Sequence, residues 1–417
     1  AILLENGSSP VIRNCVFENC TVAGAIGGDG DDGDYPSGLI NVTGNLDSQS
    51  GGHGGDGSGN GYGGAIAVLD GSNPQILNCE FKNNRATGGW GGVPGDAGTP
   101  YNEGRFGWGG NAGDGSGDGR GGALFIAVGC DPTILECTFE GNVASVGNVY
   151  PGGAESPGGE DYIEPYEEDP WSLPGMREGS DGFITSFGTN AGGAVFSEAD
   201  ANLLLESCTF NTNTAPIGAA VYADPNVVLK IQDCEFSDHD GSALYVDRNS
   251  DLEIIHSRFL NNSDNQAGGA VTIGPEAVVT SIVDCNFVGN LTGGDGGAIL
   301  TQSDITVENS VFSDNSASSE GGAFYAYYPP NPVANTLQVA FQNCEFNNSF
   351  KVQACNLTVI DSKFTHTSNK PIQLSAKTKL AFFAGNNFAY TDNPIQLNGA
   401  APKNVKIYQN PTYSDGY

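Results

Sequence analysis

Residues 282–299 read IVDCNFVGNLTGGDGGAI, and residues 307–324 read VENSVFSDNSASSEGGAF. The two stretches share one pattern. An apolar residue is followed two positions later by Asn or Asp, then by Cys or Ser, and then by a Phe after one more residue. Asn comes three positions after the Phe, and Gly-Gly-Ala with an apolar residue closes the pattern. A pattern that returns within one chain indicates a stack of similar short units.

The phenylalanine of this pattern recurs along most of the chain. Cys or Ser stands two positions before it, and in most copies Ile, Leu or Val stands five positions before it. Where nothing is inserted, neighbouring copies are 23 to 28 residues apart, as between Phe210 and Phe236, which suits one coil of three short strands. The ladder consists of Phe17, Phe81, Phe139, Phe210, Phe236, Phe259, Phe287, Phe312, Phe346 and Phe364, with a weaker copy at Phe388.

These repeats predict an all-β fold, a right-handed parallel β-helix of about eleven coils. Strands of three to five residues are too short to be stable alone, so each must pair with its equivalent in the coils above and below. Like side chains then stack into ladders, and the Gly-Gly pair supplies a corner that needs positive φ or close backbone approach. The right hand follows from the crossover rule for parallel strands.

The pairing of Gly-Gly-Ala-(Ile/Leu/Val) with Phe-x-x-Asn resembles the repeats of the chlamydial polymorphic outer-membrane proteins and related right-handed β-helix surface proteins of the pectin-lyase-like class. The resemblance covers about residues 1–365. It implies the β-helical fold and a place at the cell surface. It implies little about activity, because this fold carries adhesins, lyases and inert rods.

Three long insertions interrupt the repeat, at about residues 27–62, 85–120 and 143–191. All three fall between Phe-x-x-Asn and Gly-Gly-Ala, so we expect them to emerge side by side on one edge of the N-terminal half. The sequence thus divides into a β-helix over residues 1–365 and a region of C-terminal coils and a capping or assembly tail over residues 366–417.

Composition excludes several classes of function. The chain has 417 residues, 62 of them Gly, and a net charge of −33, which argues against nucleic acid and against anionic membrane surfaces. No apolar run is long enough for a transmembrane helix. The charge is uneven, because residues 351–417 carry +4 and residues 1–350 carry −37.

The first two insertions are rich in Gly and Asp and partly match a calcium-binding repeat, in which Asp and backbone oxygens of adjacent turns enclose the ion. The apolar residue of that repeat is missing, and Ser58 and Ser116 stand in its place. Packed glycine-rich loops without an ion are the alternative. The Ca²⁺ ligand candidates are Asp29, Asp31, Asp32, Asp56 and Asp114.

The strands that follow Gly-Gly-Ala predict an aromatic column on the outer surface. It would stack on sugar rings or on another subunit, unless the insertions fold over it. The same strands show acids only as a scattered Glu198, Asp224 and Asp247, so we expect no catalysis. The column consists of Phe125, Phe196, Tyr222, Tyr245 and Tyr325.

Seven of the ten cysteines occupy the ladder position, where Ser substitutes freely, which indicates small buried side chains. Each of the other three lies within eleven residues of a ladder cysteine, so three disulfides are candidates. These pairs are Cys15 with Cys20, Cys130 with Cys137, and Cys344 with Cys355.

Seven Asn-x-Ser/Thr sequons permit N-glycosylation, although about five would arise by chance in this composition. The acceptor candidates are Asn6, Asn19, Asn41, Asn261, Asn290, Asn347 and Asn356.

Together these features predict an extracellular or cell-surface structural protein. The chain begins inside a coil, which suggests either a missing preceding domain or a covering subunit. The acidic body and the basic C-terminal segment favour head-to-tail association into a filament. An adhesin or glycan-binding module that contacts glycans or other surface proteins is the alternative, and a Ca²⁺-dependent polysaccharide lyase is the third hypothesis.

Overall fold

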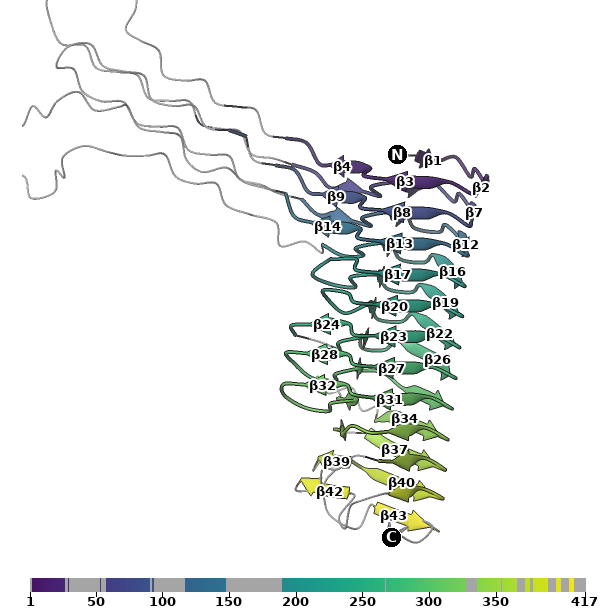
Figure 1. Cartoon of the computed structure of the whole chain (residues 1–417), viewed down its shortest axis with the longest axis vertical. Helices are drawn as coiled ribbons and strands as arrows, with labels where there is room; N and C mark the ends of the chain where they lie inside the picture. The colour runs from purple at the N-terminus through teal and green to yellow at the C-terminus, as the bar shows by residue number, and fades with distance from the viewer. Residues whose placement is uncertain are drawn as a thin grey trace, which may run out of the picture.

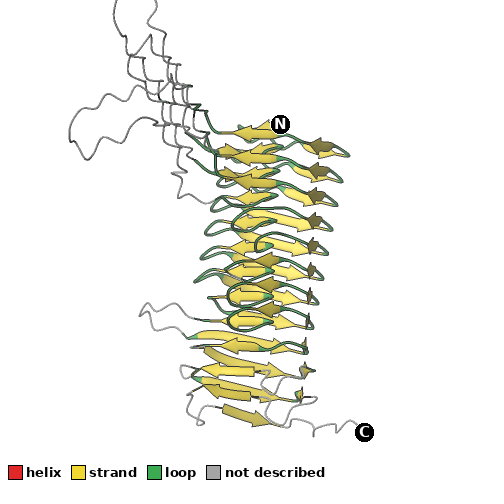
Figure 2. Cartoon of the chain, turned by 60° about the vertical axis from the view of Figure 1, so that its left-hand side comes forward, coloured by secondary structure: helices red, strands yellow, loops and turns green. Residues whose placement is uncertain are grey.

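The computed structural model describes residues 2–26, 29, 53, 58–90, 92–93, 117–147, 190–266, 268–327, 336–353, 355–365, 372–375, 378–388, 395–398 and 405–408. Within these residues the chain forms strands and turns and no helix. Successive coils stack along one axis, with the N-terminal strands at one end and the C-terminal strands at the other (Figure 1). Figure 2 shows the same stack turned by 60°. The predicted all-β, parallel β-helical fold is confirmed.

Three large parallel sheets run the length of the stack. Sheet 1 contains β1 (Ile2–Leu4), β6 (Ile66–Val68), β11 (Leu124–Ile126), β15 (Val195–Ser197), β18 (Val221–Ala223), β21 (Leu244–Val246), β25 (Val271–Ile273), β29 (Ile299–Thr301), β33 (Phe324–Ala326), β36 (Phe350–Val352), β39 (Ile372–Ser375) and β42 (Ile395–Asn398). Sheet 2 contains β2 (Val11–Arg13), β7 (Gln75–Leu77), β12 (Thr133–Leu135), β16 (Asn202–Glu206), β19 (Val228–Gln232), β22 (Asp251–Ile255), β26 (Val278–Val283), β30 (Ile305–Glu308), β34 (Leu337–Gln342), β37 (Cys355–Ile360), β40 (Leu380–Ala384) and β43 (Val405–Tyr408). Sheet 3 contains β3 (Val16–Glu18), β8 (Glu80–Lys82), β13 (Thr138–Glu140), β17 (Thr209–Asn211), β20 (Glu235–Ser237), β23 (Arg258–Leu260), β27 (Asn286–Val288), β31 (Val311–Ser313), β35 (Glu345–Phe346), β38 (Lys363–Phe364) and β41 (Asn387–Phe388).

Three small sheets lie at the corner between sheet 3 and sheet 1. The first pairs the strands that lead into the insertions, and the second pairs strands that return from them. They contain β4 (Thr21–Ala23), β9 (Arg85–Thr87) and β14 (Val143–Ser145), then β5 (Gly61–Tyr62) and β10 (Gly119–Arg120), and finally β24 (Ser263–Asp264), β28 (Leu291–Thr292) and β32 (Ser316–Ala317).

The register places like residues on one another. Phe139 of β13 lies opposite Phe81 of β8 and Phe210 of β17. From Phe17 to Phe364 the ladder rings stack with centroids 4.7–5.1 Å apart and planes within 8° of parallel. The rings from Phe81 onward are fully buried, so this ladder forms the centre of the hydrophobic core.

Turn residues make the corners tight enough for stacking. Between sheets 2 and 3, each coil places one residue at positive φ, a conformation that Asn and Asp adopt more easily than most residues. At the Gly-Gly corner, a Cβ on Gly64 would lie 2.1 Å from the carbonyl oxygen of Gly122, so only glycine lets the coils approach there.

A buried asparagine ladder closes the corner after sheet 3. Asn142 is typical. Its Nδ2 donates to the carbonyl oxygen of Phe81 and to Oδ1 of Asn213, each at 2.9 Å, and its own Oδ1 accepts from the backbone N–H of Asn84 at 3.0 Å. Each amide thus satisfies backbone groups that the turn leaves unpaired. The predicted Asn of each repeat is therefore a structural side chain.

The stack of coils includes short strands within the predicted insertion ranges. β5, β9, β10 and β14 fall inside the ranges assigned to insertions, yet they pair with equivalent strands of neighbouring coils. After residue 365, the strands β39 to β43 continue sheets 1, 2 and 3 in register. The inserted residues not described above lie outside the part of the chain that the structure describes.

Candidate functional site on the outer face of sheet 1

The middle residue of each three-residue strand in sheet 1 points away from the core. In four consecutive coils this residue is aromatic, and the ring centroids are 5.8, 4.9 and 5.2 Å apart. The next two coils place Thr272 and Leu300 there, and Tyr325 follows. We call the four stacked rings the outer aromatic column: Phe125, Phe196, Tyr222 and Tyr245.

Most of this column is covered. Only 1% of Phe196 and 5% of Tyr222 is exposed. The ring of Tyr62 lies 4.4 Å from that of Phe125, and the guanidinium carbon of Arg120 lies 5.2 Å above the ring of Phe196. The rings point outward as predicted. The hypothesis that they form an open surface for stacking is wrong, because residues at the ends of the insertions shield these rings from water. Tyr325 is also buried, and Tyr245 alone is half-buried.

A row of carboxylates runs beside the column. Glu198, Asp224 and Asp247 each follow the column residue of their coil by two positions, so they share its face. Because the coils are consecutive, neighbouring residues of the row are about 4.8 Å apart along the axis. The description of these acids as scattered is wrong: coils of unequal length separate them in sequence, and the sheet register aligns them. We call these three residues the acidic row.

Arg120 connects the row to the insertions. It ends β10, where the chain returns from the second insertion. Its Nη2 lies 3.2 Å from Oδ2 of Asp118, and its Nη1 lies 3.8 Å from Oε1 of Glu198. Its Nε is buried and has no hydrogen-bond partner among the described residues. Glu198 also accepts from the backbone N–H of Val128 at 3.3 Å. The guanidinium is therefore held in place between two carboxylates and a ring.

The row gives its members different electrostatic environments. Burial raises the pKa of Asp224 above its usual range, and the charges of Asp247 and Glu198 act in the same direction, while a hydrogen bond with Tyr222 and the charge of Arg120 oppose them. Burial also raises the pKa of Tyr222 and of Tyr245. The site therefore combines carboxyl groups with phenol groups that burial keeps protonated.

Comparison with known proteins agrees with this architecture. A family model described as a right handed beta helix region matches residues 177–312, and a Chlamydia polymorphic membrane protein repeat matches residues 309–327. The chain is a right-handed parallel β-helix whose repeats resemble those of the chlamydial polymorphic membrane proteins. The chain is thus a repeat protein, and the two matches support a surface-exposed location.

One curated relative of this β-helix is the metabotropic glutamate receptor-like protein P of Dictyostelium discoideum. It is 28% identical over 182 residues, which are 40% of this chain and 12% of that protein. The match thus spans about an eighth of that relative's length. No solved structure matches the chain significantly.

Of the five calcium ligand candidates, the structure describes Asp29. Oδ1 of Asp29 accepts from the backbone N–H of Val93 at 3.0 Å, which links the first two insertions. Asp31, Asp32, Asp56 and Asp114 lie outside the described residues. Among the residues that are described, no group of three or more His, Cys, Asp or Glu side chains is arranged to hold a metal ion, and the acidic row is no exception.

The candidate disulfides are wrong, because all ten cysteines are free. In each pair a strand lies between the two residues. β3 separates Cys15 from Cys20, and β12 separates Cys130 from Cys137. Cys355 begins β37 opposite Leu337, whereas Cys344 follows the far end of β34. A disulfide needs Cα atoms within about 7 Å, and a strand of six residues is about 20 Å long.

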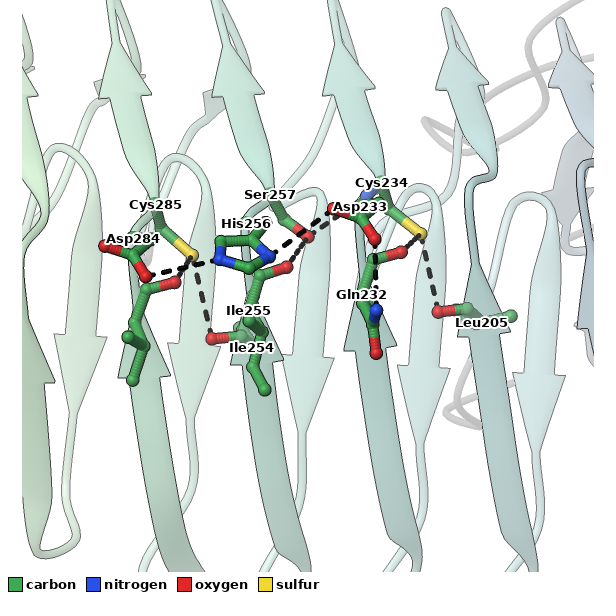
Figure 3. Close-up of polar contacts among 11 residues, drawn as sticks. Leu205, Gln232, Asp233, Cys234, Ile254, Ile255, His256, Ser257, Asp284 and Cys285 are labelled. Carbon is green, nitrogen blue, oxygen red and sulfur yellow. Dashed lines mark hydrogen bonds and ion pairs between the residues drawn. The ribbon is translucent and has the colours of Figure 1, made fainter.

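The ladder cysteines face the backbone instead. Figure 3 shows the corner between sheets 2 and 3, where Sγ of Cys234 lies 3.2 Å from the carbonyl oxygen of Gln232 and 3.5 Å from that of Leu205. On the outside of the same corner, His256 lies between Asp233 and Asp284, at 3.5 and 3.3 Å. His256 is exposed and remote from the acidic row, so this trio is a surface ion-pair group.

The seven sequons fall into distinct settings. Asn6, Asn19 and Asn261 are exposed, and Asn347 and Asn356 are half-buried. Asn290 belongs to the buried asparagine ladder, and its Nδ2 donates to the carbonyl oxygen of Phe259 and to Oδ1 of Asn315, each at 2.9 Å. The prediction that Asn290 is a glycosylation site is therefore wrong for the folded chain. Asn41 lies outside the described residues.

None of the described residues forms a helix of the length and hydropathy that crossing a bilayer requires.

Proposed function

We propose that this β-helix is a recognition module and that it binds a glycan along the acidic row. The observation that carries the proposal is the alignment of Glu198, Asp224 and Asp247 on consecutive coils, beside the half-buried Tyr245. Carboxylates accept hydrogen bonds from sugar hydroxyls, and an aromatic ring contacts the apolar face of a sugar. A ladder with one acceptor group per coil suits an extended, repeating ligand.

The surroundings of the row support a binding site. Arg120 and Ala191 stand where the chain returns from the second and third insertions, and Arg120 contacts the row directly. Loops that a rigid scaffold holds next to a polar face are where binding sites commonly form. The stacked coils supply such a scaffold, because each strand pairs on both sides along most of the rod.

A glycan array with the full chain tests the proposal. We then expect Asp224→Asn and Asp247→Asn to weaken binding of any retained glycan by about tenfold each, the effect of losing a charged hydrogen bond. Glu253→Gln is the matched control, because Glu253 lies in the same coil as Asp247 but pairs with Lys230 on sheet 2. The proposal fails if no glycan is retained, or if the row variants bind as the control does.

We propose binding without cleavage. Two described cations contact the row, Arg120 and Arg248. Arg120 pairs with Asp118 and Glu198, and Arg248 pairs with Asp247, and these ion pairs leave both guanidinium groups poorly suited to act as a base. Hydrolysis is the competing outcome, because a carboxyl with a raised pKa beside other carboxylates is the arrangement of glycosidases. Incubation of the chain with a bound glycan decides between the two. New reducing ends or unsaturated products would show that the chain cleaves the glycan, and would contradict binding without cleavage.

Head-to-tail assembly into a surface filament is the second candidate function. The uneven charge favours it, since residues 1–350 carry −37 and residues 351–417 carry +4. Opposite charges on the two parts would steer one copy onto the next. Sedimentation at low salt should then show species larger than one chain that dissociate as salt rises. A single monomeric species at low salt and high concentration would remove this candidate.

A further inference from the structure

An exposed apolar patch lies on the outer face of sheet 2, near its C-terminal end. Phe382 of β40 and Tyr408 of β43 have ring centroids 5.5 Å apart, and 38% of Leu380 and 53% of Tyr408 is exposed. With Thr358 and Lys406 they line a shallow cavity of about 440 Å³. Apolar patches that stay open on a surface usually have an occupant.

The patch differs from most of its sheet in how far its apolar residues are exposed. The residues that precede Phe382 in the same outward column include Lys230, Glu253 and Thr306. Polar side chains are what a solvated sheet face requires. Apolar residues elsewhere on this face, such as Leu135 and Ile255, are half-buried, whereas Leu380 and Tyr408 are exposed. The exposed residues of the patch are therefore the ones that a covering group would shield.

A glycosylation sequon lies directly over this patch. Asn356 pairs in register with Leu380, and Thr358, the third residue of the sequon, pairs with Phe382. Both residues point outward, because alternate residues of β37 share a face. One hydrogen of Asn356 Nδ2 is donated to Oε1 of Gln338 at 3.2 Å, and no described residue accepts the second hydrogen, which is open to substitution.

We propose that Asn356 carries an N-linked glycan and that its first sugar covers the patch. An oligosaccharide on a polyprenyl diphosphate is the donor class. The Asn356 amide nitrogen bonds to the anomeric carbon of the sugar and gives up one proton. The bond from that carbon to the diphosphate oxygen breaks, and the diphosphate leaves with the electron pair. The apolar face of the attached sugar then packs on Phe382 and Tyr408, one strand spacing or more from Asn356.

Two other sequons provide comparisons within the same chain. The Asn290 amide is buried with both hydrogens donated, so the folded protein cannot present it. Asn261 is exposed at a turn, and its Nδ2 donates to Oδ1 of Asp238 at 3.3 Å, so it faces a carboxylate. The proposal therefore separates three identical consensus sequences by their surroundings.

The test is expression of the full chain through a eukaryotic secretory pathway, followed by glycopeptide mass spectrometry. We expect Asn356 to be occupied in the wild type and in Thr358→Ser, which keeps the sequon, and unoccupied in Thr358→Val, which keeps the side-chain shape. Asn290 should be unoccupied throughout. An unmodified Asn356 in the secreted wild type would overturn the proposal.

The covering is tested separately by native digestion with a peptide N-glycosidase. Release from Asn356 should be about tenfold slower than release from Asn261, since ring stacking has to be lost first. The double variant Phe382→Ser, Tyr408→Ser should bring the two rates together. Equal rates in the wild type would refute the packing of the sugar on the patch. The acidic row lies on sheet 1 and the patch on sheet 2, so this proposal and glycan binding fail independently.

Discussion

The two aromatic stacks of this protein lie on opposite sides of their sheets and differ in regularity. The inner ladder of sheet 3 has a Phe in every coil, with ring planes within 8° of parallel from Phe17 to Phe364. The outer aromatic column of sheet 1 mixes Phe and Tyr, its centroids are 4.9–5.8 Å apart, and it stops at Thr272. The same coil spacing thus produces one uniform stack and one variable stack.

Enclosure explains the difference. The inner rings lie among side chains of all three sheets, so a smaller residue would leave a cavity that no neighbour can fill. The outer rings pack against their own sheet and against residues such as Tyr62 and Arg120, whose side chains are partly exposed to solvent. The inner ladder therefore specifies the fold, while the outer face is free to vary and to carry a site.

The strongest test of this comparison is Phe236→Ala in the inner ladder. Phe236 stacks between Phe210 and Phe259 at 4.7 and 4.8 Å. We expect a loss of about 3–5 kcal/mol in the free energy of unfolding, because the cavity is enclosed. Denaturant unfolding followed by circular dichroism gives the value, and hydrogen exchange shows whether the loss is confined to nearby coils. A loss below about 1 kcal/mol would contradict the role assigned to the ladder.

In the buried asparagine ladder, one position holds His239 in place of Asn, and this residue should make the stability depend on pH. His239 is buried, its Nδ1 accepts from the backbone N–H of Asn213 at 3.0 Å, and its Nε2 has no partner among the described atoms. Burial lowers the pKa of His239 to about 3 from its usual 6.5. The unfolded chain therefore binds the proton more readily, and stability is complete above pH 6.5 and is lost as pH falls toward 3.

The loss attributable to His239 should reach about 2 kcal/mol at pH 5. Thermal unfolding from pH 7 to pH 4 measures it, with His239→Asn as the control. The Asn side chain extends the amide ladder and does not titrate, so its curve should separate from the wild-type curve below pH 6.5. Parallel curves for the two proteins would show that His239 is not the source of acid sensitivity.

A smaller effect is expected in the outer column. Phe196→Ala removes a ring that is only 1% exposed, yet the side chain of Arg120 that covers it is itself partly exposed, so water can enter the space. We expect a loss of about 2 kcal/mol, below the range for an enclosed Phe. Denaturant unfolding beside Phe236→Ala makes the comparison direct. Equal losses in the two variants would mean that the outer cover is as rigid as the core.

The sequence predicted the inner structure better than the outer site. The ladder of Phe repeats in every coil, and the Gly-Gly corners and the turn Asn repeat in most coils. Because equivalent positions superpose in the stack, their spacing alone predicts them. Glu198, Asp224 and Asp247 occur in only three coils, so no repeat identifies them and only the strand register aligns them. The row can be found in the sequence if the Gly-Gly-Ala copies are aligned first and the residues at each aligned position are then compared.

The same lesson applies to two further errors. The disulfide between Cys344 and Cys355 relied on closeness in sequence, but the intervening chain crosses to the other end of sheet 2. Asn290 and Asn261 carry the same consensus, yet one side chain points inward and the other outward. The direction of a side chain within its coil decides both cases, and sequence separation does not report it.

The smallest predicted effect tests why Cys and Ser alternate in the inner corner. Sγ of Cys234 accepts from the backbone N–H of Cys208 at 3.4 Å, and Oγ of Ser257, one coil later, accepts from that of Cys234 at 3.1 Å. Cys234→Ser keeps this acceptor, so we expect a loss below about 1 kcal/mol.

Cys234→Val keeps a similar shape but leaves the N–H of Cys208 unpaired, which should cost about 1–3 kcal/mol. Denaturant unfolding with and without a thiol reductant distinguishes the explanations. Because every cysteine is free, the reductant should leave the wild-type midpoint unchanged. A lower midpoint with reductant would indicate that a disulfide is present. Equal losses in the Ser and Val variants would mean that packing of the sulfur, and not its acceptor role, selects cysteine at this position.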